Sequence, residues 1–124
     1  MKFLRCEKCG KTVGVIVDHG CPTMCCGEEM KELVANTTDA ATEKHVPVVE
    51  VSGNTVTVTV GSVEHPMMEA HYIQWIALET KEGMQRKSLT PDSAPKAVFA
   101  LAEGDAPVRA YEYCNLHGLW AADI

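Results

Sequence analysis

Four of the five histidines in this chain and one isolated cysteine lie in three short clusters. The clusters are Glu43-Lys44-His45-Val46-Pro47, His65-Pro66-Met67-Met68-Glu69-Ala70-His71 and Cys114-Asn115-Leu116-His117. A single histidine is more often a structural or surface residue than a ligand, but four imidazoles grouped with a C-x-x-H pair predict a shared metal site. Five such ligands are one too many for tetrahedral zinc, and they suit an iron centre that keeps a position open for a small substrate.

The number and softness of these ligands discriminate among metals. Blue copper uses two histidines and one cysteine, and zinc uses three or four ligands, so either metal would leave imidazoles without a role. Iron accepts five or six ligands of mixed nitrogen and sulfur character and changes valence. Four neutral imidazoles and one thiolate around Fe(II) leave a charge of about +1, which favours a small anion at the open position. The predicted chemistry is an inner-sphere, one-electron reduction of a small anionic oxidant.

A second ligand set lies near the N-terminus, where Cys6-Glu7-Lys8-Cys9 is followed after fifteen residues by Cys25-Cys26. Four thiolates at this spacing predict a sulfur-only metal site. Zinc is a strong rival to iron there, because such sites are its commonest structural home and it binds these ligands more tightly than Fe(II) does. Adjacent cysteines are unusual for the double C-x-x-C of zinc ribbons, which favours iron.

The other cysteine of this region, Cys21, is expected to stay out of the metal site. Five of the six cysteines lie between residues 6 and 26, and Cys114 has none nearby. A disulfide scaffold would spread its cysteines through a secreted chain, so the clustering favours metal binding in a reducing compartment. Cys21 is followed directly by Pro22 and fits the set less well than Cys25-Cys26. His19 lies outside the three clusters and is expected at the surface.

Length and charge restrict the class of protein. A chain of 124 residues has room for one ordinary core and a small appendage. No apolar run approaches the roughly 18 to 20 residues of a membrane span, and the first residues lack the apolar region of a secretory signal, so we expect a cytoplasmic protein with no membrane partner. The net charge is −6, which argues against nucleic acid as a partner. An anionic substrate must therefore be attracted by local positive charge.

Two domains are expected to position these ligands. The segment 1–35 is shorter than the roughly 40 residues at which a hydrophobic core suffices, so bound metal must supply much of its folding energy. One short strand is expected there, at 13–17. Residues 36–42 are small and polar and are expected to link this metal-stabilised knuckle to a second domain, so that the boundaries are 1–35 and 36–124.

From residue 46 onward the sequence has the period of β-strands. The segment 49–51 leads into a turn at 52–54, and 55–60 then alternates apolar and hydroxyl residues, which predicts a hairpin. Further strands are expected at 72–80, 84–89, 96–102 and 108–113. Six or seven short strands without a helix predict an antiparallel β-sandwich, with a small barrel as the alternative. The ligand clusters fall in loops and at strand ends, with Gly118 as a hinge after the last strand.

These motifs resemble those of a known family. The clusters at 43–47, 65–71 and 114–120 resemble the three active-site motifs of superoxide reductase, and the N-terminal cysteines resemble the desulforedoxin-type iron centre of its two-iron form, desulfoferrodoxin. The resemblance implies an immunoglobulin-like β-sandwich preceded by a small desulforedoxin- or rubredoxin-like knuckle. It also implies a cytoplasmic homodimer, a rubredoxin-like electron donor, and the reduction of superoxide by one electron and two protons to hydrogen peroxide.

The resemblance also assigns roles to residues. It implies two irons per chain, one held by Cys6, Cys9, Cys25 and Cys26 and one held by His45, His65, His71, His117 and Cys114. In the second site the four imidazoles would be equatorial and the thiolate axial. Glu43 would occupy the sixth position once iron is oxidised, and Lys44 would attract superoxide and assist protonation of the product. The residues alone leave zinc open in the four-cysteine site, and they leave open an electron carrier or a metal-binding module in which the histidine site is not catalytic.

Overall fold

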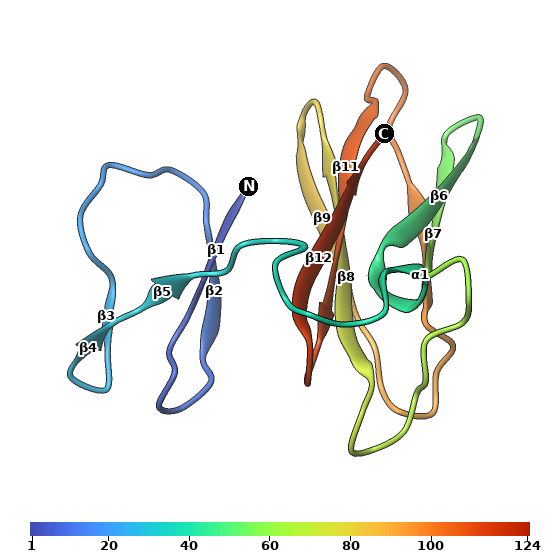
Figure 1. The fold of residues 1–124 in the computed structure, drawn as a ribbon. Helices are drawn as coiled ribbons and strands as arrows, with labels where there is room; N and C mark the ends of the chain where they lie inside the picture. Colours follow the sequence, from blue (N-terminus) through green and yellow to red (C-terminus); the bar gives the residue numbers. More distant parts are fainter. The chain divides into compact units, whose positions relative to one another are not determined.

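The computed structural model describes residues 1–124, which divide into two compact units, Met1–Val34 and Ala35–Ile124. Figure 1 shows the strands of the first unit, β1 to β5, and those of the second, β6 to β12. No helix in the structure has the length and apolar content needed to cross a bilayer.

The first unit is built on a small antiparallel sheet in the order β2-β1-β5. Its strands are β1 (Lys2–Arg5), β2 (Thr12–Val15) and β5 (Lys31–Glu32), and β3 (Met24–Cys25) pairs with β4 (Glu28–Glu29). Its buried apolar side chains are Phe3, Cys6 and Met30, a core too small to hold the unit together by itself. The strand expected at 13–17 is observed as β2, and β1 was not predicted because its four residues do not alternate between apolar and polar side chains.

The second unit is a β-sandwich of two antiparallel sheets, with strand orders β10-β7-β6 and β12-β11-β8-β9. Its elements are α1 (Thr42–His45), β6 (Pro47–Ser52), β7 (Thr55–Val60), β8 (Ile73–Thr80), β9 (Gly83–Ser88), β10 (Lys96–Ala100), β11 (Pro107–Cys114) and β12 (Gly118–Asp123). Seven strands divided three and four confirm the predicted fold class and not the barrel alternative.

The core of the sandwich lies between the two sheets. Val56, Val58 and Val60 point inward from β7 at every second residue, as the alternation in the sequence predicts. They pack in one cluster with Ile76 and Phe99, which also have no exposed surface. The cluster extends to Cys114, so one end of this rigid core carries a predicted ligand.

Most of the predicted strands of this unit are confirmed. The predicted hairpin is observed as β6 and β7, with Ser52 opposite Thr55. The pair β8 and β9 is also antiparallel, with Thr80 opposite Gly83. The strands expected at 96–102 and 108–113 are observed as β10 and β11.

Two expectations about this unit are wrong. Gly118 does not end the last strand but begins another, β12, which pairs with β11 from Cys114 to Arg109. Leu119, Trp120 and Ala121 are all buried, so this strand lacks the alternation by which strands are recognised. The expected absence of a helix is also wrong, because one helical turn, α1, carries residues of the first ligand cluster.

The segment expected to be a linker is partly fixed to the edge of β12. The backbone N–H of Asn36 donates to the Leu119 carbonyl over 3.0 Å. The Asn36 side-chain amide donates to the Ala121 carbonyl over 3.1 Å and accepts from the Ala121 N–H over 2.9 Å. Asn36 therefore pairs with this strand edge in the way that another strand would.

Candidate metal centres

The structure brings together the five side chains that the sequence grouped. His45 comes from α1, His65 from the loop after β7, and His71 from the segment before β8. Cys114 ends β11, and His117 lies in the turn that leads to β12. The ligand atoms of all five lie within 4.8 Å of one another. The rigid sandwich thus collects donors from widely separated positions at one point, although their role as ligands stays a prediction.

The four imidazoles form a closed ring of edge-to-face contacts. Successive centroids are 4.7 Å apart for His45 and His65, 4.6 Å for His65 and His71, 5.0 Å for His71 and His117, and 4.9 Å for His117 and His45. The Cys114 sulfur is 3.5 Å from His65 Nε2 and 3.8 Å from His117 Nδ1. His65 and His117 occupy opposite corners of the ring, so the sulfur is in contact with two imidazoles that are not neighbours in it.

Hydrogen bonds select the nitrogen that each imidazole presents. Nδ1 of His45 donates to the Ala41 carbonyl over 2.7 Å, and Nδ1 of His65 donates to the Pro66 carbonyl over 2.6 Å. These bonds leave Nε2 of both rings as a lone pair that faces the centre. Nε2 of His71 is buried without a hydrogen-bond partner. His117 faces the others through Nδ1, which lies 3.1 Å from His45 Nε2.

This donor set fits a metal ion. Two imidazole lone pairs facing each other at 3.1 Å repel unless a cation or a shared proton lies between them, and the unpartnered nitrogen of His71 needs the same partner. Four nitrogens and one sulfur exceed the tetrahedral set of zinc and agree with the five-ligand iron site predicted from the sequence.

Burial keeps the imidazoles in the form that binds metal. It lowers the pKa of His65 to about 4, and it also lowers the pKa of His45 and His71. These rings are therefore neutral at physiological pH. Burial raises the pKa of the Cys114 thiol, against the opposing effect of the Leu116 and His117 backbone N–H groups, so a bound cation is needed to favour the thiolate.

Two further residues fix the turn that carries Cys114 and His117. Trp120 stacks on the His45 ring at 4.9 Å, and its indole N–H donates to the His117 carbonyl over 3.1 Å. Asn115 accepts from the Tyr72 N–H over 2.9 Å and donates to the Ala70 carbonyl over 3.1 Å, which joins the turn to the segment around His71. Both residues lie within or beside the third motif, but only their contacts in space reveal these roles.

Glu112 is a buried acid that the sequence did not single out. Its side chain has no exposed surface, and neither carboxyl oxygen has a hydrogen-bond partner. It is two residues before Cys114 on β11, so both side chains point to the inner face of the sheet. Burial raises the pKa of Glu112 to about 9, which keeps this carboxyl neutral at physiological pH.

Glu43 and Lys44 are both exposed on α1, next to His45. Neither side chain belongs to the cluster of five donor atoms. The positive charge of Lys44 contributes to the lowered pKa of His45 and of His71, so its field reaches the site.

The second predicted ligand set is also assembled. The sulfur atoms of Cys6, Cys9, Cys25 and Cys26 lie within 4.8 Å of one another, and none of them forms a disulfide. The Cys9 and Cys25 sulfurs are 3.6 Å apart. The Cys9 backbone N–H lowers the pKa of the Cys6 thiol to about 6, which favours the thiolate that a metal needs. A tetrahedral site of four sulfurs, the four-cysteine centre, therefore fits the first unit.

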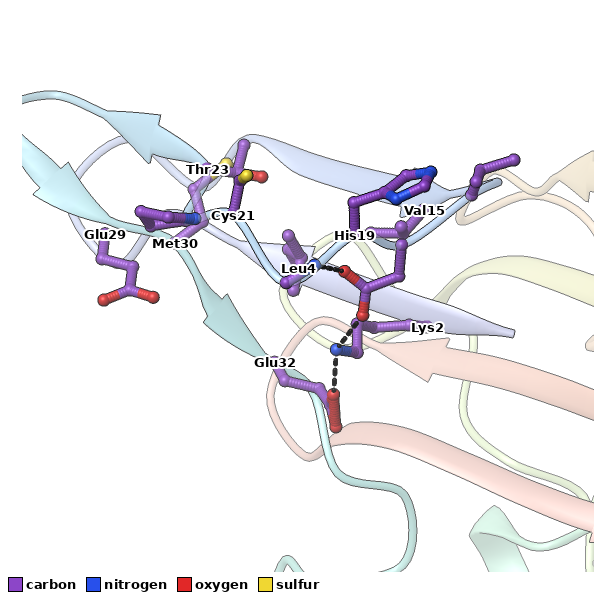
Figure 2. Close-up of a pocket in the computed structure, with 13 residues that line it drawn as sticks. Lys2, Leu4, Val15, His19, Cys21, Thr23, Glu29, Met30 and Glu32 are labelled. Atoms are coloured by element: carbon purple, nitrogen blue, oxygen red, sulfur yellow. Dashed lines mark hydrogen bonds and ion pairs between the residues drawn. The ribbon is translucent and has the colours of Figure 1, made fainter.

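Cys21 and His19 lie elsewhere in the first unit. They border a pocket of about 350 Å³ on the loop that follows β2, as Figure 2 shows. On one side of it the Lys2 ammonium binds the carboxylates of Asp18, at 2.7 Å, and Glu32, at 3.3 Å. Cys21 is exposed and lies outside the four-sulfur cluster.

Comparison with known proteins agrees with this arrangement. A family model described as desulfoferrodoxin matches residues 37–123. The chain belongs to the desulfoferrodoxin family. The desulfoferrodoxin of Syntrophotalea carbinolica is 46% identical, with 99% of this chain and 96% of that protein covered. The range matched by the family model contains the three histidine clusters. The N-terminal cysteines lie outside that range, but the alignment with the Syntrophotalea carbinolica protein covers nearly the whole chain.

Solved structures of desulfoferrodoxin relatives show the same fold. The superoxide reductase from Treponema pallidum superposes with a TM-score of 0.83 at 44% identity, covering 97% of this chain and 98% of that one. The one-iron superoxide reductase from Giardia intestinalis covers 67% of this chain and 98% of its own, with a TM-score of 0.57 at 35% identity. The resemblance inferred from the motifs is therefore confirmed.

Proposed function

We propose that this desulfoferrodoxin is a superoxide reductase, which converts superoxide, one electron and two protons into hydrogen peroxide without releasing dioxygen. The observation that carries this proposal is the closed ring of four imidazoles with a single sulfur in contact with two opposite members. Two relatives named superoxide reductase support it: the one from Treponema pallidum matches nearly the whole chain, and the one from Giardia intestinalis matches its larger part.

Iron is the metal that these ligands fit, held by His45, His65, His71, His117 and Cys114. Bound in the ferrous state, it would supply one electron and an open position for a small anion. Burial keeps the imidazoles of His45, His65 and His71 neutral, and hydrogen bonds to backbone carbonyls direct His45 and His65. Backbone N–H groups of the turn donate to the Cys114 sulfur, which moderates its electron donation.

Glu43 and Lys44 complete the proposed active site from their helical turn. The Lys44 ammonium attracts the superoxide anion toward a protein of net charge −6 and donates a hydrogen bond, and then a proton, from Nζ. Glu43 would supply a carboxylate to the open position once the iron is oxidised and the product has left. Their exposure on α1 beside His45 supports both roles, because a mobile side chain at the rim can approach and withdraw.

The unit with the four-cysteine centre is proposed to bind a second iron, with residues 1–35 as its domain and 36–124 as the catalytic domain. The match of the one-iron relative to 67% of this chain supports a catalytic part that needs no such unit. Zinc in the four-cysteine centre is the alternative, and metal analysis of the purified chain distinguishes the two. We also propose a cytoplasmic homodimer that takes electrons from a rubredoxin-like donor, in line with the resemblance.

Product analysis tests the proposed function. The reduced protein is mixed anaerobically with a known quantity of superoxide, and peroxide and dioxygen are both measured. We expect one peroxide for each superoxide consumed and no dioxygen above that of spontaneous dismutation. Dioxygen at one for every two superoxide molecules would indicate a dismutase, and no consumption of superoxide would indicate an electron carrier or a metal-binding module.

A further inference from the structure

Gly61 follows β7 directly, and the backbone of α1 lies against it. A Cβ placed on Gly61 would be 2.7 Å from the Glu43 carbonyl oxygen, 3.0 Å from that of Val46 and 3.1 Å from the carbonyl carbon of Lys44. All three are main-chain atoms, which cannot rotate out of the way as a side chain does. Gly61 is buried and does not have a positive φ, so the need for glycine here is one of space.

Hydrogen bonds hold the same contact in place. The Glu43 carbonyl accepts from the Val63 N–H over 2.9 Å and from the Ser62 hydroxyl over 3.2 Å. The turn that supplies these donors is closed by the bond from the His65 N–H to the Val60 carbonyl, at 3.0 Å. The segment that carries His65 is thereby joined to the helical turn of the first ligand cluster.

We propose that Gly61 is a positioning residue for the metal site. Because Gly61 has no side chain, the backbone of α1 packs directly against it, and this contact determines where α1 places Glu43, Lys44 and His45. For the effect on turnover, the proposal rests on the proposed function. Any side chain at this position would push the helix backbone away by roughly half an ångström or more, because closer non-bonded approach is repulsive.

Such a displacement acts directly on the site. The His45 ring is fixed to its own helical turn by the bond to the Ala41 carbonyl, so it moves with α1. Its Nε2 lies 3.1 Å from His117 Nδ1, which belongs to a different element and stays in place. A shift of about 1 Å in a catalytic group can cost on the order of 100-fold in rate. Glu43 and Lys44 would be displaced together with His45.

The test compares Gly61→Ala with Gly14→Ala. Gly14 also lacks a positive φ, but a Cβ there would meet only side-chain atoms of Met1 and Phe3 in the other unit, so it is a matched control. In Gly61→Ala we expect the Val63 amide to exchange its hydrogen at least about 10-fold faster. We also expect azide affinity of the oxidised protein to change by about 10-fold, and superoxide reduction to fall by about 10- to 100-fold.

In Gly14→Ala all three quantities should stay within about 2-fold of wild type. A Gly61→Ala protein with wild-type exchange at Val63, wild-type azide affinity and wild-type turnover overturns the proposal. Urea unfolding of the second unit is measured alongside, because the spectrum of the four-cysteine centre reports on the first unit and not on the sandwich that contains Gly61.

If Gly61→Ala does not fold, the same measurements are made on Ser62→Ala, which removes one hydrogen bond to the Glu43 carbonyl without adding volume. Faster exchange at Val63 together with changed azide affinity supports the proposal, and wild-type values of both overturn it. Hydrogen exchange is measured without superoxide. A wild-type protein that fails to reduce superoxide would therefore refute the proposed function, while the exchange test of the contact between Gly61 and α1 would remain valid.

Discussion

At the scale of single residues, the backbone decides which atom each ligand offers. His45 and His65 give their Nδ1 hydrogen to nearby carbonyls and so present Nε2. His117 presents Nδ1, because it lies three residues after Cys114 in a tight turn and its nearer nitrogen faces the centre. The sulfur is the one donor outside the ring of imidazoles, so its removal is the sharpest change to a single residue.

Replacing Cys114 with serine should reduce turnover by at least about 100-fold, because changes outside the ligand shell already cost about 10- to 100-fold. A hydroxyl cannot supply the electron density that a thiolate supplies. Stopped-flow mixing with superoxide measures the rate, and the spectrum of the four-cysteine centre is the control and should not change. Near-native turnover with iron bound would contradict the five-ligand site.

Replacing Glu112 with methionine should raise the free energy of unfolding by about 1–3 kcal/mol, because it removes two buried oxygen atoms that lack partners. Urea unfolding at fixed iron content measures this. Glu50→Met is the matched control, since Glu50 is an exposed strand residue of the same sandwich, and it should change stability little. A loss of stability in Glu112→Met would mean that the carboxyl is held by ordered water.

At the scale of elements, most strands of the sandwich were predictable from alternation or from runs of β-forming residues between turns, but the last strand was not. The hairpin of β6 and β7 follows from strict alternation over 55–60, because its second strand buries every other residue. The last strand, β12, buries three successive residues and has no such pattern. The single turn of α1 is too short for helical periodicity, and its position depends on Gly61, whose role only the tertiary contact reveals.

The donor side chains that meet at the candidate site were predictable, and the residues that support them were not. Imidazoles and thiolates in compact motifs carry their chemistry in their residue types, so the two clusters could be recognised in the sequence. Glu112 lies between two tyrosines, and that alternation would place it on the solvent side, whereas it faces the core beside Cys114. The contacts of Trp120 join residues from separate elements, and no spacing in the sequence encodes them.

The first unit should depend on its metal, since its core contains so few buried side chains. Cys26→Ser should abolish the spectrum of the four-cysteine centre and increase hydrogen exchange throughout residues 1–34. The rate of superoxide reduction with an artificial donor should stay within about 2-fold of wild type, because the predicted catalytic ligands all belong to the other unit. If the rate fell as far as in Cys114→Ser, our assignment of the chemistry to the second unit would be wrong.

At the scale of the whole molecule, superoxide must approach a protein of net charge −6. Lys44 provides local attraction, which salt screens over roughly 8 to 10 Å at ordinary ionic strength. Lys44→Ala should therefore react more slowly at low salt and depend less on salt than wild type, with an unchanged iron spectrum. Pulse radiolysis at several ionic strengths measures both slopes, and parallel slopes would show that Lys44 does not guide the substrate.

The central claim is that four imidazoles and one thiolate hold a single iron in the second unit. Iron K-edge X-ray absorption of the reduced Cys26→Ser chain tests it most directly, because the signal then comes from this site alone. We predict one iron per chain with one sulfur and four imidazole nitrogens around it. An iron with no sulfur neighbour, with several sulfur neighbours, or absent from the purified chain would contradict the account.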